Sequence, residues 1–285
     1  MSVQAIGLLG MGALVLLIFL RVPVAIAMGL VGFFGYAAVD GFAKALRVLG
    51  QTPFDVATGY TLSVVPLFIL MGDFAMRSGM SANLYRSAQS LFVGMRGAHA
   101  FATLGACAGF GAICGSSLAT AATMTRVAIP EMRRLGYDDR LSTGSVAAGG
   151  SLGILIPPSI PFVIYALIAE QSVPKLFAAG LIPGLLLTVL YMIAAKVMIA
   201  WKPTWAPAAG DHQAWGDRLR DIFASWDVML LFGITIGGMY AGWFSPTEAA
   251  SVGAFGALAI GLARKQLSLQ AIRESFVETI ATSCM

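Results

Sequence analysis

The sequence predicts an all-α membrane protein: a polytopic helical bundle with a re-entrant helical hairpin and a broken transmembrane helix. Of the 285 residues, 58% are hydrophobic and 11% are charged, whereas a soluble domain carries about 25% charged residues. Several apolar segments approach the roughly 20 residues that cross a bilayer. The segments are 3–20, 22–39, 56–76, 100–131, 142–169, 176–200, 226–244 and 247–263, and another begins near 275.

The segment 100–131 has the pattern of a hairpin that enters the membrane and returns. Gly115, Ser116 and Ser117 interrupt it, and each half spans roughly 18–20 Å of helix. That is short for a hydrocarbon core about 30 Å thick. Carbonyls and hydroxyls at this tip, including Thr120, suit an alkali cation, and the helix that starts after Ser117 suits a carboxylate. The alternative is an interface where small residues let helices approach.

The segment 142–169 is long enough to cross, but it contains two helix-breaking runs. The first holds Gly149, Gly150, Ser151 and Gly153, and the second is Pro157-Pro158-Ser159-Ile160-Pro161. Prolines remove backbone donors and clash with the preceding turn. We therefore expect a break near the middle of the bilayer, where this helix and the hairpin tip could hold one ion between them. A kinked helix with a water in the gap is the simpler alternative.

The basic residues predict the topology. If the chain alternates across the membrane and 100–131 returns to its own side, most of the 18 Lys and Arg residues fall on one face, and only Lys44, Arg47 and Lys175 fall on the other. The positive-inside rule makes the crowded face cytoplasmic and the N-terminus periplasmic. Two full spans in place of the hairpin would give the same result.

Most other charged residues near the apolar segments have structural explanations. Asp73 and Arg77 are spaced for an ion pair within one helix. Arg126 and Lys196 can extend toward the membrane surface, although Arg126 is also a candidate for contact with a substrate. Ser245–Glu248 and Thr52–Asp55 have the pattern of helix starts, the first of them with a capping box.

Several function classes lack their signatures. The basic residues form no stripe with interleaved aromatics, so we expect no nucleic-acid partner. Cys107, Cys114 and Cys284 are an odd number within apolar segments, which argues against disulfides. Ser116 has no apparent base partner and no Walker A motif occurs, so we expect neither an enzyme nor a resident cofactor. We also expect no cleaved signal peptide.

Five regions follow from these features. They are scaffold helices of a first repeat in 1–99, half of a transport domain in 100–169, a connecting transmembrane helix in 170–201, a cytoplasmic linker in 202–225, and the start of a second repeat in 226–285. Pro23 and Pro246, each followed by small residues and an apolar run, give weak support to an inverted repeat.

Five stretches of the sequence resemble one known family. They are Phe110 to Thr120; Ile129 to Met132 with Gly136-Tyr137; Gly149 to Pro161; Leu176 to Gly184; and Ser245 to Ala250. Together they are similar to the large membrane subunit (DctM type) of tripartite ATP-independent periplasmic (TRAP) transporters. The resemblance covers nearly the whole chain.

The resemblance implies sodium-coupled import of an organic acid, such as a C4-dicarboxylate or sialic acid, across the bacterial inner membrane by an elevator mechanism. It implies two partners, a small membrane subunit (DctQ type) and a periplasmic substrate-binding protein (DctP type). Carried over by motif, sodium would lie near Gly115, Ser116, Ser117, Gly150 and Ser151. The substrate and ion site would also include Thr120, Gly149, Gly153, Pro157 and Pro158.

Two departures from the family pattern keep alternatives open. Cys114 stands where a small hydroxyl residue is expected. The family's large subunits are longer, and this sequence ends without a second hairpin, so we expect a C-terminally truncated form that does not transport alone. Another sodium-coupled carboxylate carrier, a non-transporting fragment and, more distantly, an intramembrane enzyme are the other hypotheses.

Overall fold

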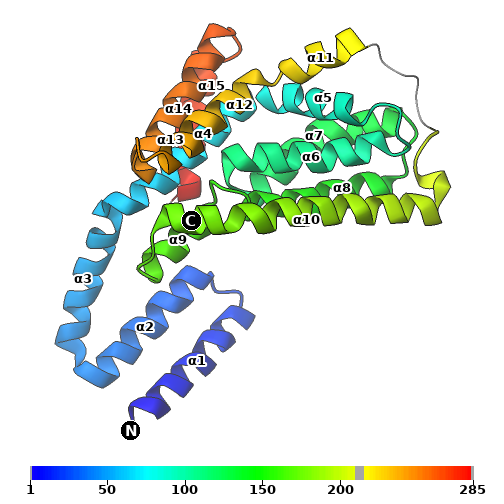
Figure 1. Ribbon diagram of the computed structural model, residues 1–285. Coiled ribbons are helices and arrows are strands. Elements are labelled where there is room, and N and C mark those ends of the chain that lie inside the picture. The colour runs from blue at the N-terminus through cyan, green and yellow to red at the C-terminus, as the bar shows by residue number, and fades with distance from the viewer. Residues whose placement is uncertain (1, 209–214, 284–285) are drawn as a thin grey trace. The chain divides into compact units, whose positions relative to one another are not determined.

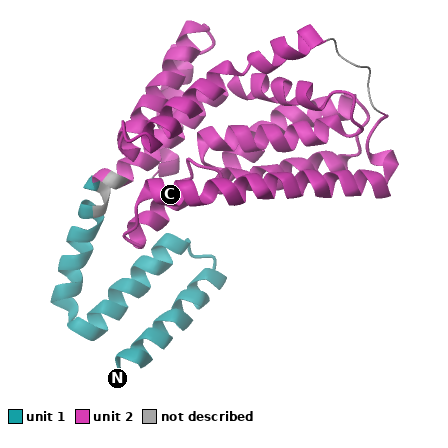
Figure 2. Ribbon diagram, in the orientation of Figure 1, with its two compact units in different colours: residues 1–59 teal, residues 60–285 magenta. Residues whose placement is uncertain are grey.

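The computed structural model describes residues 2–208 and 215–283, and the chain divides into two compact units, 1–59 and 60–285 (Figure 2). All regular elements within the described ranges are helical. This confirms the all-α fold class.

The first unit contains three helices, α1 (Val3–Phe19), α2 (Val24–Asp40) and α3 (Phe42–Thr58). Helix α2 packs against both α1 and α3. Gly41, with φ of 95°, ends α2 and lets α3 begin at the next residue. The predicted helix start at Thr52–Asp55 is therefore wrong, because Pro53 lies inside α3, where it removes only one backbone donor.

The second unit contains the remaining helices, and its α-helices are labelled in Figure 1. In chain order they are η1 (Tyr60–Ser63), α4 (Val64–Arg77), α5 (Met80–Phe92), α6 (Ala98–Cys114), α7 (Ser117–Arg134), α8 (Asp139–Ser151), η2 (Leu152–Ile154), α9 (Ile160–Ile168), α10 (Val173–Trp201), η3 (Pro203–Trp205), α11 (Trp215–Phe223), α12 (Trp226–Phe232), the π-helical η4 (Gly233–Gly237), α13 (Gly238–Tyr240), α14 (Pro246–Ala263) and α15 (Leu269–Ser283).

The apolar segment predicted at 56–76 is divided differently in the structure. Its first residues belong to α3, and α4 begins only at Val64. Helix α4 then continues into α5 with a bend of 70° at Gly79, whose φ of 73° suits a residue without a side chain. The bend turns α5 along α6, where the two helices pack together.

The core of the second unit surrounds the α6–α7 pair. Helix α6 contacts α5, α7, α8 and α10, while α14 and α15 both pack on α4 (Figure 1). The largest completely buried side chains include Phe68, Phe74 and Phe110. Helix α4 contacts α6 on one side of this arrangement and α14 and α15 on the other. It therefore connects the hairpin to the C-terminal helices.

Two of the described helices, α10 and α14, are each long and apolar enough to cross a membrane. Two bent helix pairs also pass this test when each pair is taken together. They are α4 with α5, and α11 with the segment 226–240, so the number of candidate spans rises to four if each pair forms one span. Helices α1, α2 and α6 are apolar but shorter. These helices fit the predicted polytopic class.

Helix α14 begins with the predicted capping box. The Ser245 N–H donates to Glu248 Oε2 at 2.7 Å, and the Glu248 N–H donates to Ser245 Oγ at 3.3 Å. These two bonds satisfy donors that every helix start leaves free. The sequence prediction for this element is confirmed.

A buried ion pair joins α12 to the residue after α14. The side chain of Asp227 is completely buried, and its Oδ2 lies 2.8 Å from Arg264 Nη1. The Val228 N–H donates to its Oδ1, and the Arg264 guanidinium also lies over the Trp226 ring. Asp227 therefore has one guanidinium to balance its charge.

Substituting Arg264 by Ala should destabilise the protein by about 3–5 kcal/mol, because the carboxylate of Asp227 would remain buried and unpaired. The double variant Arg264→Ala with Asp227→Ala should recover much of this loss. Thermal unfolding in detergent, followed by circular dichroism, measures both. An unchanged unfolding midpoint in the single variant would contradict the assigned role of the pair.

Candidate functional site

Helices α6 and α7 form a helical hairpin whose turn is only two residues long. Gly115 takes a left-handed conformation with φ of 62°, and extended Ser116 caps α7 by accepting from the Ala119 N–H at 3.3 Å. Glycine tolerates this φ, and serine is a preferred N-cap residue. The interruption lies where the sequence predicted it, at the Gly-Ser-Ser run.

The predicted broken helix is also interrupted. Helix α8 ends at Ser151, the single turn η2 follows, and α9 resumes at Ile160. The Pro157–Pro158 peptide between them is cis, and the Ser159 hydroxyl donates to the Ile154 carbonyl at 2.6 Å. This segment leaves backbone acceptors that no helix satisfies.

The unpaired acceptors lie in a row. Within the described ranges, four consecutive backbone carbonyls accept no hydrogen bond, those of Leu155, Ile156, Pro157 and Pro158. Buried carbonyls are normally paired. In a membrane, unpaired ones are tolerated where protein or a water-filled cavity receives them.

The hairpin tip and the broken helix touch directly. The Ile160 N–H donates to the Gly115 carbonyl at 3.3 Å. A Cβ on Gly115 would lie 2.5 Å from the Pro158 carbonyl oxygen, and a Cβ on Gly111 would lie 2.7 Å from the Gly153 Cα. These distances leave no room for a side chain at either glycine.

Two further glycines, on α8 and η2, meet the second arm of the hairpin. A Cβ on Gly150 would lie 2.7 Å from that of Ala121, and a Cβ on Gly153 would lie 2.8 Å from both the Ser116 carbonyl oxygen and Thr120 Oγ1. The glycines therefore let α7 approach the broken helix at backbone distance.

The structure thus places most of the predicted site residues at one junction, but not all of their side chains face it. Gly149 instead meets Cys107 on α6. The Ser151 hydroxyl donates to the Ala148 carbonyl and lies 3.1 Å from the Tyr191 hydroxyl on α10. The Ser117 carbonyl oxygen lies 3.3 Å from a Cβ on Gly150.

The cysteines are structural at this junction. Cys107 and Cys114 are both buried free thiols, and Cys114 Sγ lies 3.0 Å from Thr120 Oγ1. The Cys114 thiol, which stands where the family pattern has a small hydroxyl residue, is therefore within hydrogen-bonding distance of the Thr120 hydroxyl. Cys284 and His212 lie outside the described residues.

An ion pair fixes the turn between the hairpin and the broken helix. Arg133, at the end of α7, donates two hydrogen bonds to the Asp139 carboxylate, from Nε at 2.7 Å and from Nη2 at 3.1 Å. These bonds hold the pKa of Asp139 below its usual value. The pair lies at the surface, where the chain passes from α7 into α8.

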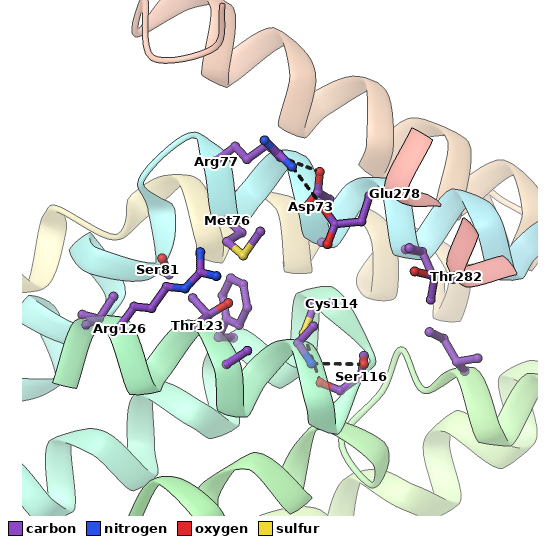
Figure 3. Close-up of a pocket in the computed structure, with 17 residues that line it drawn as sticks. Asp73, Met76, Arg77, Ser81, Cys114, Ser116, Thr123, Arg126, Glu278 and Thr282 are labelled. Atoms are coloured by element: carbon purple, nitrogen blue, oxygen red, sulfur yellow. Dashed lines mark hydrogen bonds and ion pairs between the residues drawn. The ribbon is translucent and has the colours of Figure 1, made fainter. Parts of the chain in front are cut away.

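A cavity of about 550 Å³ lies between α4, α5, α7 and the C-terminal α15 (Figure 3). Its wall includes residues of the hairpin tip. The lining residues that carry polar groups or charge are Asp73, Arg77, Ser81, Cys114, Ser116, Thr123, Arg126, Glu278 and Thr282. The predicted ion junction therefore opens, through Cys114 and Ser116, toward a space of small-molecule size.

The two arginines of the cavity differ in their partners. Arg77 forms the predicted pair with Asp73 at 2.8 Å and also contacts Glu274 at 2.8 Å and Glu278 at 2.9 Å. Arg126 has no hydrogen bond or ion pair with any described residue. The sequence did not predict the contacts of Arg77 with α15, or that Arg126 would line a cavity.

One signal in the sequence could have singled out this wall. Thr123 and Arg126 are three residues apart, so they share one face of α7. A polar pair within an apolar hairpin is a candidate functional site, and no comparable signal marks the partners of Arg77.

Comparison with known proteins identifies the family. Residues 11–285 match the model of the "Tripartite ATP-independent periplasmic transporter, DctM component". The chain is 34% identical to the isethionate TRAP transporter permease protein DctMQ of Oleidesulfovibrio alaskensis, over 96% of this chain and 43% of that protein. It is 40% identical to the C4-dicarboxylate TRAP transporter large permease protein DctM of Pseudomonas aeruginosa, over 74% and 48%.

A third relative is the sialic acid TRAP transporter permease protein SiaT of Haemophilus influenzae, 36% identical over 78% of this chain and 36% of that protein. The chain spans about half the length of the curated relatives it matches. The family consists of transporters rather than enzymes, and together with the apolar helices it indicates a multi-pass membrane protein. This chain belongs to the DctM family of tripartite ATP-independent periplasmic transporters.

Proposed function

We propose that this chain forms part of the permease of a secondary transporter that imports an organic acid together with sodium. The names of its relatives support the substrate class, since they specify isethionate, C4-dicarboxylates, sialic acid and ectoine. Each of these molecules carries an acidic group. An organic anion that enters a cell with a negative internal potential moves against the electric field. Cotransport of a cation cancels part of the transferred charge and so lowers the free energy needed for import.

The observation that carries this proposal is the junction of hairpin tip and broken helix. Interrupted membrane helices supply carbonyl oxygens that coordinate sodium in secondary transporters. Here the Pro158 carbonyl accepts no hydrogen bond from the described residues and faces the Gly115 backbone. Sodium would lie at this junction, near Gly115, Ser116, Ser117, Gly150 and Ser151.

The remaining members of the predicted site would shape the junction. Gly149 and Gly153 allow the close helix contacts, Pro157 and Pro158 keep the segment unwound, and Thr120 donates to the Ser116 carbonyl at 2.8 Å. The Ser151 hydroxyl faces Tyr191, so Ser151 would contribute its backbone. The elevator motion implied by the family would move this junction across the membrane.

We further propose a bacterial inner-membrane location, a periplasmic N-terminus, and two partners. The excess of Lys and Arg on one predicted face supports the orientation. The family description names a tripartite, periplasmic system, which supports a DctP-type binding protein and a DctQ-type small membrane subunit. The binding protein would deliver the acid to the periplasmic side.

Substituting Gly150 by Ala should weaken the response to sodium. The new Cβ would lie 2.7 Å from that of Ala121, so α7 and α8 must separate, at a cost of about 1–3 kcal/mol. Sodium-dependent thermal stabilisation of the purified permease measures the effect. We expect the sodium affinity to fall by about 5- to 150-fold, since every 1.4 kcal/mol is a factor of ten.

Gly144→Ala is the matched control, because it lies on the same helix and a Cβ there meets nothing within 4 Å. It should leave the sodium response unchanged and slightly stabilise α8. Equal sodium responses in both variants would place the ion elsewhere.

Uptake by proteoliposomes that contain the complete permease, of which this chain would form part, should require both a sodium gradient and the binding protein. We expect removal of either one to reduce uptake of a radiolabelled acid to the background of empty vesicles, because the gradient supplies the energy and the binding protein supplies the substrate. Uptake that persists with potassium in place of sodium would contradict the coupling. Uptake that persists without the binding protein would contradict the partnership.

A further inference from the structure

The wall of the cavity formed by α7 carries a positive charge that forms no ion pair with any described residue. Arg126 lies near the middle of α7, between the hairpin tip and the Arg133–Asp139 pair. Its guanidinium has five donors, and none of them bonds to a described residue. In Figure 3 its side chain lies beside the cavity, apart from the cluster of Asp73, Arg77 and Glu278.

The carboxylates of the cavity are already engaged. Arg77 contacts both Asp73 and Glu278, and it contacts Glu274 as well. One guanidinium is therefore shared among three carboxylates, and no acidic side chain of the described residues pairs with Arg126. An anion entering the cavity would meet Arg126 as its free cation.

Thr123, one turn before Arg126, has an unused hydroxyl. Its residue is 4% exposed, and its Oγ1 is buried without a hydrogen-bond partner among the described residues. Threonines in helices commonly bond to the carbonyl four residues earlier. Thr120 does so with Ser116 at 2.8 Å, and Thr125 does so with Ala121 at 2.7 Å, but Thr123 does not.

An unpaired buried hydroxyl destabilises a protein unless a partner arrives. Thr123 lines the same cavity as Arg126, and the i, i+3 spacing places both on one helix face. Ser81, at the start of α5, lines the cavity from the opposite helix. Arg126, Thr123 and Ser81 therefore line one cavity from two helices, and none of these three side chains has a hydrogen-bond partner among the described residues.

We propose that Arg126 and Thr123 bind the carboxylate of the transported acid, with the guanidinium donating to both carboxylate oxygens and the Thr123 hydroxyl to one of them. Arginine matches a carboxylate in this paired geometry. The cavity, at about 550 Å³, lies within the range of small-molecule sites. This inference rests on the proposed function, because it names residues that would recognise the acid.

The proposed carboxylate site at Arg126 lies apart from the proposed sodium junction, but the same cavity reaches both. Ser116 and Cys114 belong to both the hairpin tip and the cavity wall. Arg126 lies ten residues beyond Ser116 on the same helix, or about 15 Å along the axis. A carboxylate at Arg126 would therefore occupy the cavity without taking sodium ligands from the tip.

The test is equilibrium binding of radiolabelled succinate and N-acetylneuraminate to the purified permease in detergent, with sodium present. Arg126→Gln should weaken binding of whichever acid the wild type binds by about 10- to 100-fold, as expected for hydrogen bonds to a charged group. The Arg126→Lys variant should bind the acid with an affinity between those of the wild type and Arg126→Gln, since lysine keeps the charge but loses the paired geometry. Arg140→Gln, which removes an exposed arginine of α8 outside this cavity, is the matched control.

Thr123→Val supplies a second, independent readout. It should weaken acid binding several-fold while leaving the unfolding temperature unchanged or raised, because it replaces an unsatisfied hydroxyl with a methyl group. Sodium-dependent stabilisation should persist in all of these variants. Together these results would separate recognition of the acid from folding and from the ion site.

Three outcomes would overturn the proposal. If Arg126→Gln binds the acid as the wild type does, the carboxylate lies elsewhere, while the proposed transport function stands. If the variant instead loses only co-purified anionic lipid, Arg126 binds headgroups. If the wild type binds neither acid while sodium still stabilises it, the carboxylate substrate class fails, and this site fails with it.

Discussion

The structure depends on one constraint, which is that a helix interrupted inside an apolar environment must find partners for its backbone. Two interruptions occur in this chain, at Gly115-Ser116 and between η2 and α9. They face each other, and the Ile160 N–H to Gly115 carbonyl bond joins them. Gly111, Gly150 and Gly153 make the approach possible because a Cβ at any of them would meet an atom of the opposite segment. The four carbonyls at 155–158 accept no hydrogen bond from the described residues, and this is the reason for treating the junction as a site and not only as a packing contact.

Ion pairs, in contrast, organise the elements around the hairpin. Arg77 ties α4 to α15, and Asp227 with Arg264 ties α12 to the end of α14. Asp73, Arg77 and Glu278 also line the cavity, so the pairs of Arg77 hold α4 and α15 together in the cavity wall opposite α7. The two kinds of contact have different consequences for motion. The close contacts of Gly150 and Gly153 with α7 resist separation of α7 from the broken helix. The ion pairs of Arg77 with the exposed carboxylates of Glu274 and Glu278 contribute little stability individually and can be exchanged, whereas the buried Asp227–Arg264 pair cannot lose one partner without a large cost.

The sequence predicted the features that depend on local chemistry. The hairpin expected at 100–131 occupies Ala98–Arg134, with its turn at the Gly-Ser-Ser run, and the capping box at Ser245 is present. Glycine, proline and serine act through their own backbone conformation, so their positions in the sequence are informative. The features that were missed depend on contacts between distant residues. Arg77 meets Glu274 and Glu278 about 200 positions away, and the bend at Gly79 places α5 against α6. Hydrophobicity alone could not divide 56–76 correctly, because α3 continues through Pro53.

The distance between the two proposed sites limits how sodium and acid can be coupled. A sodium ion at the hairpin tip and a carboxylate at Arg126 would be about 15 Å apart along α7. Their direct attraction is then about 1 kcal/mol at an effective dielectric constant of about 20, which changes affinity by less than about tenfold. Tight coupling therefore needs a mechanical component. Helix α7 provides one, because its N-terminus forms the hairpin tip and its middle carries Thr123 and Arg126. A cation that holds the tip against the broken helix would also fix the position of these two residues relative to α4 and α5, so that the acid meets its donors already in place.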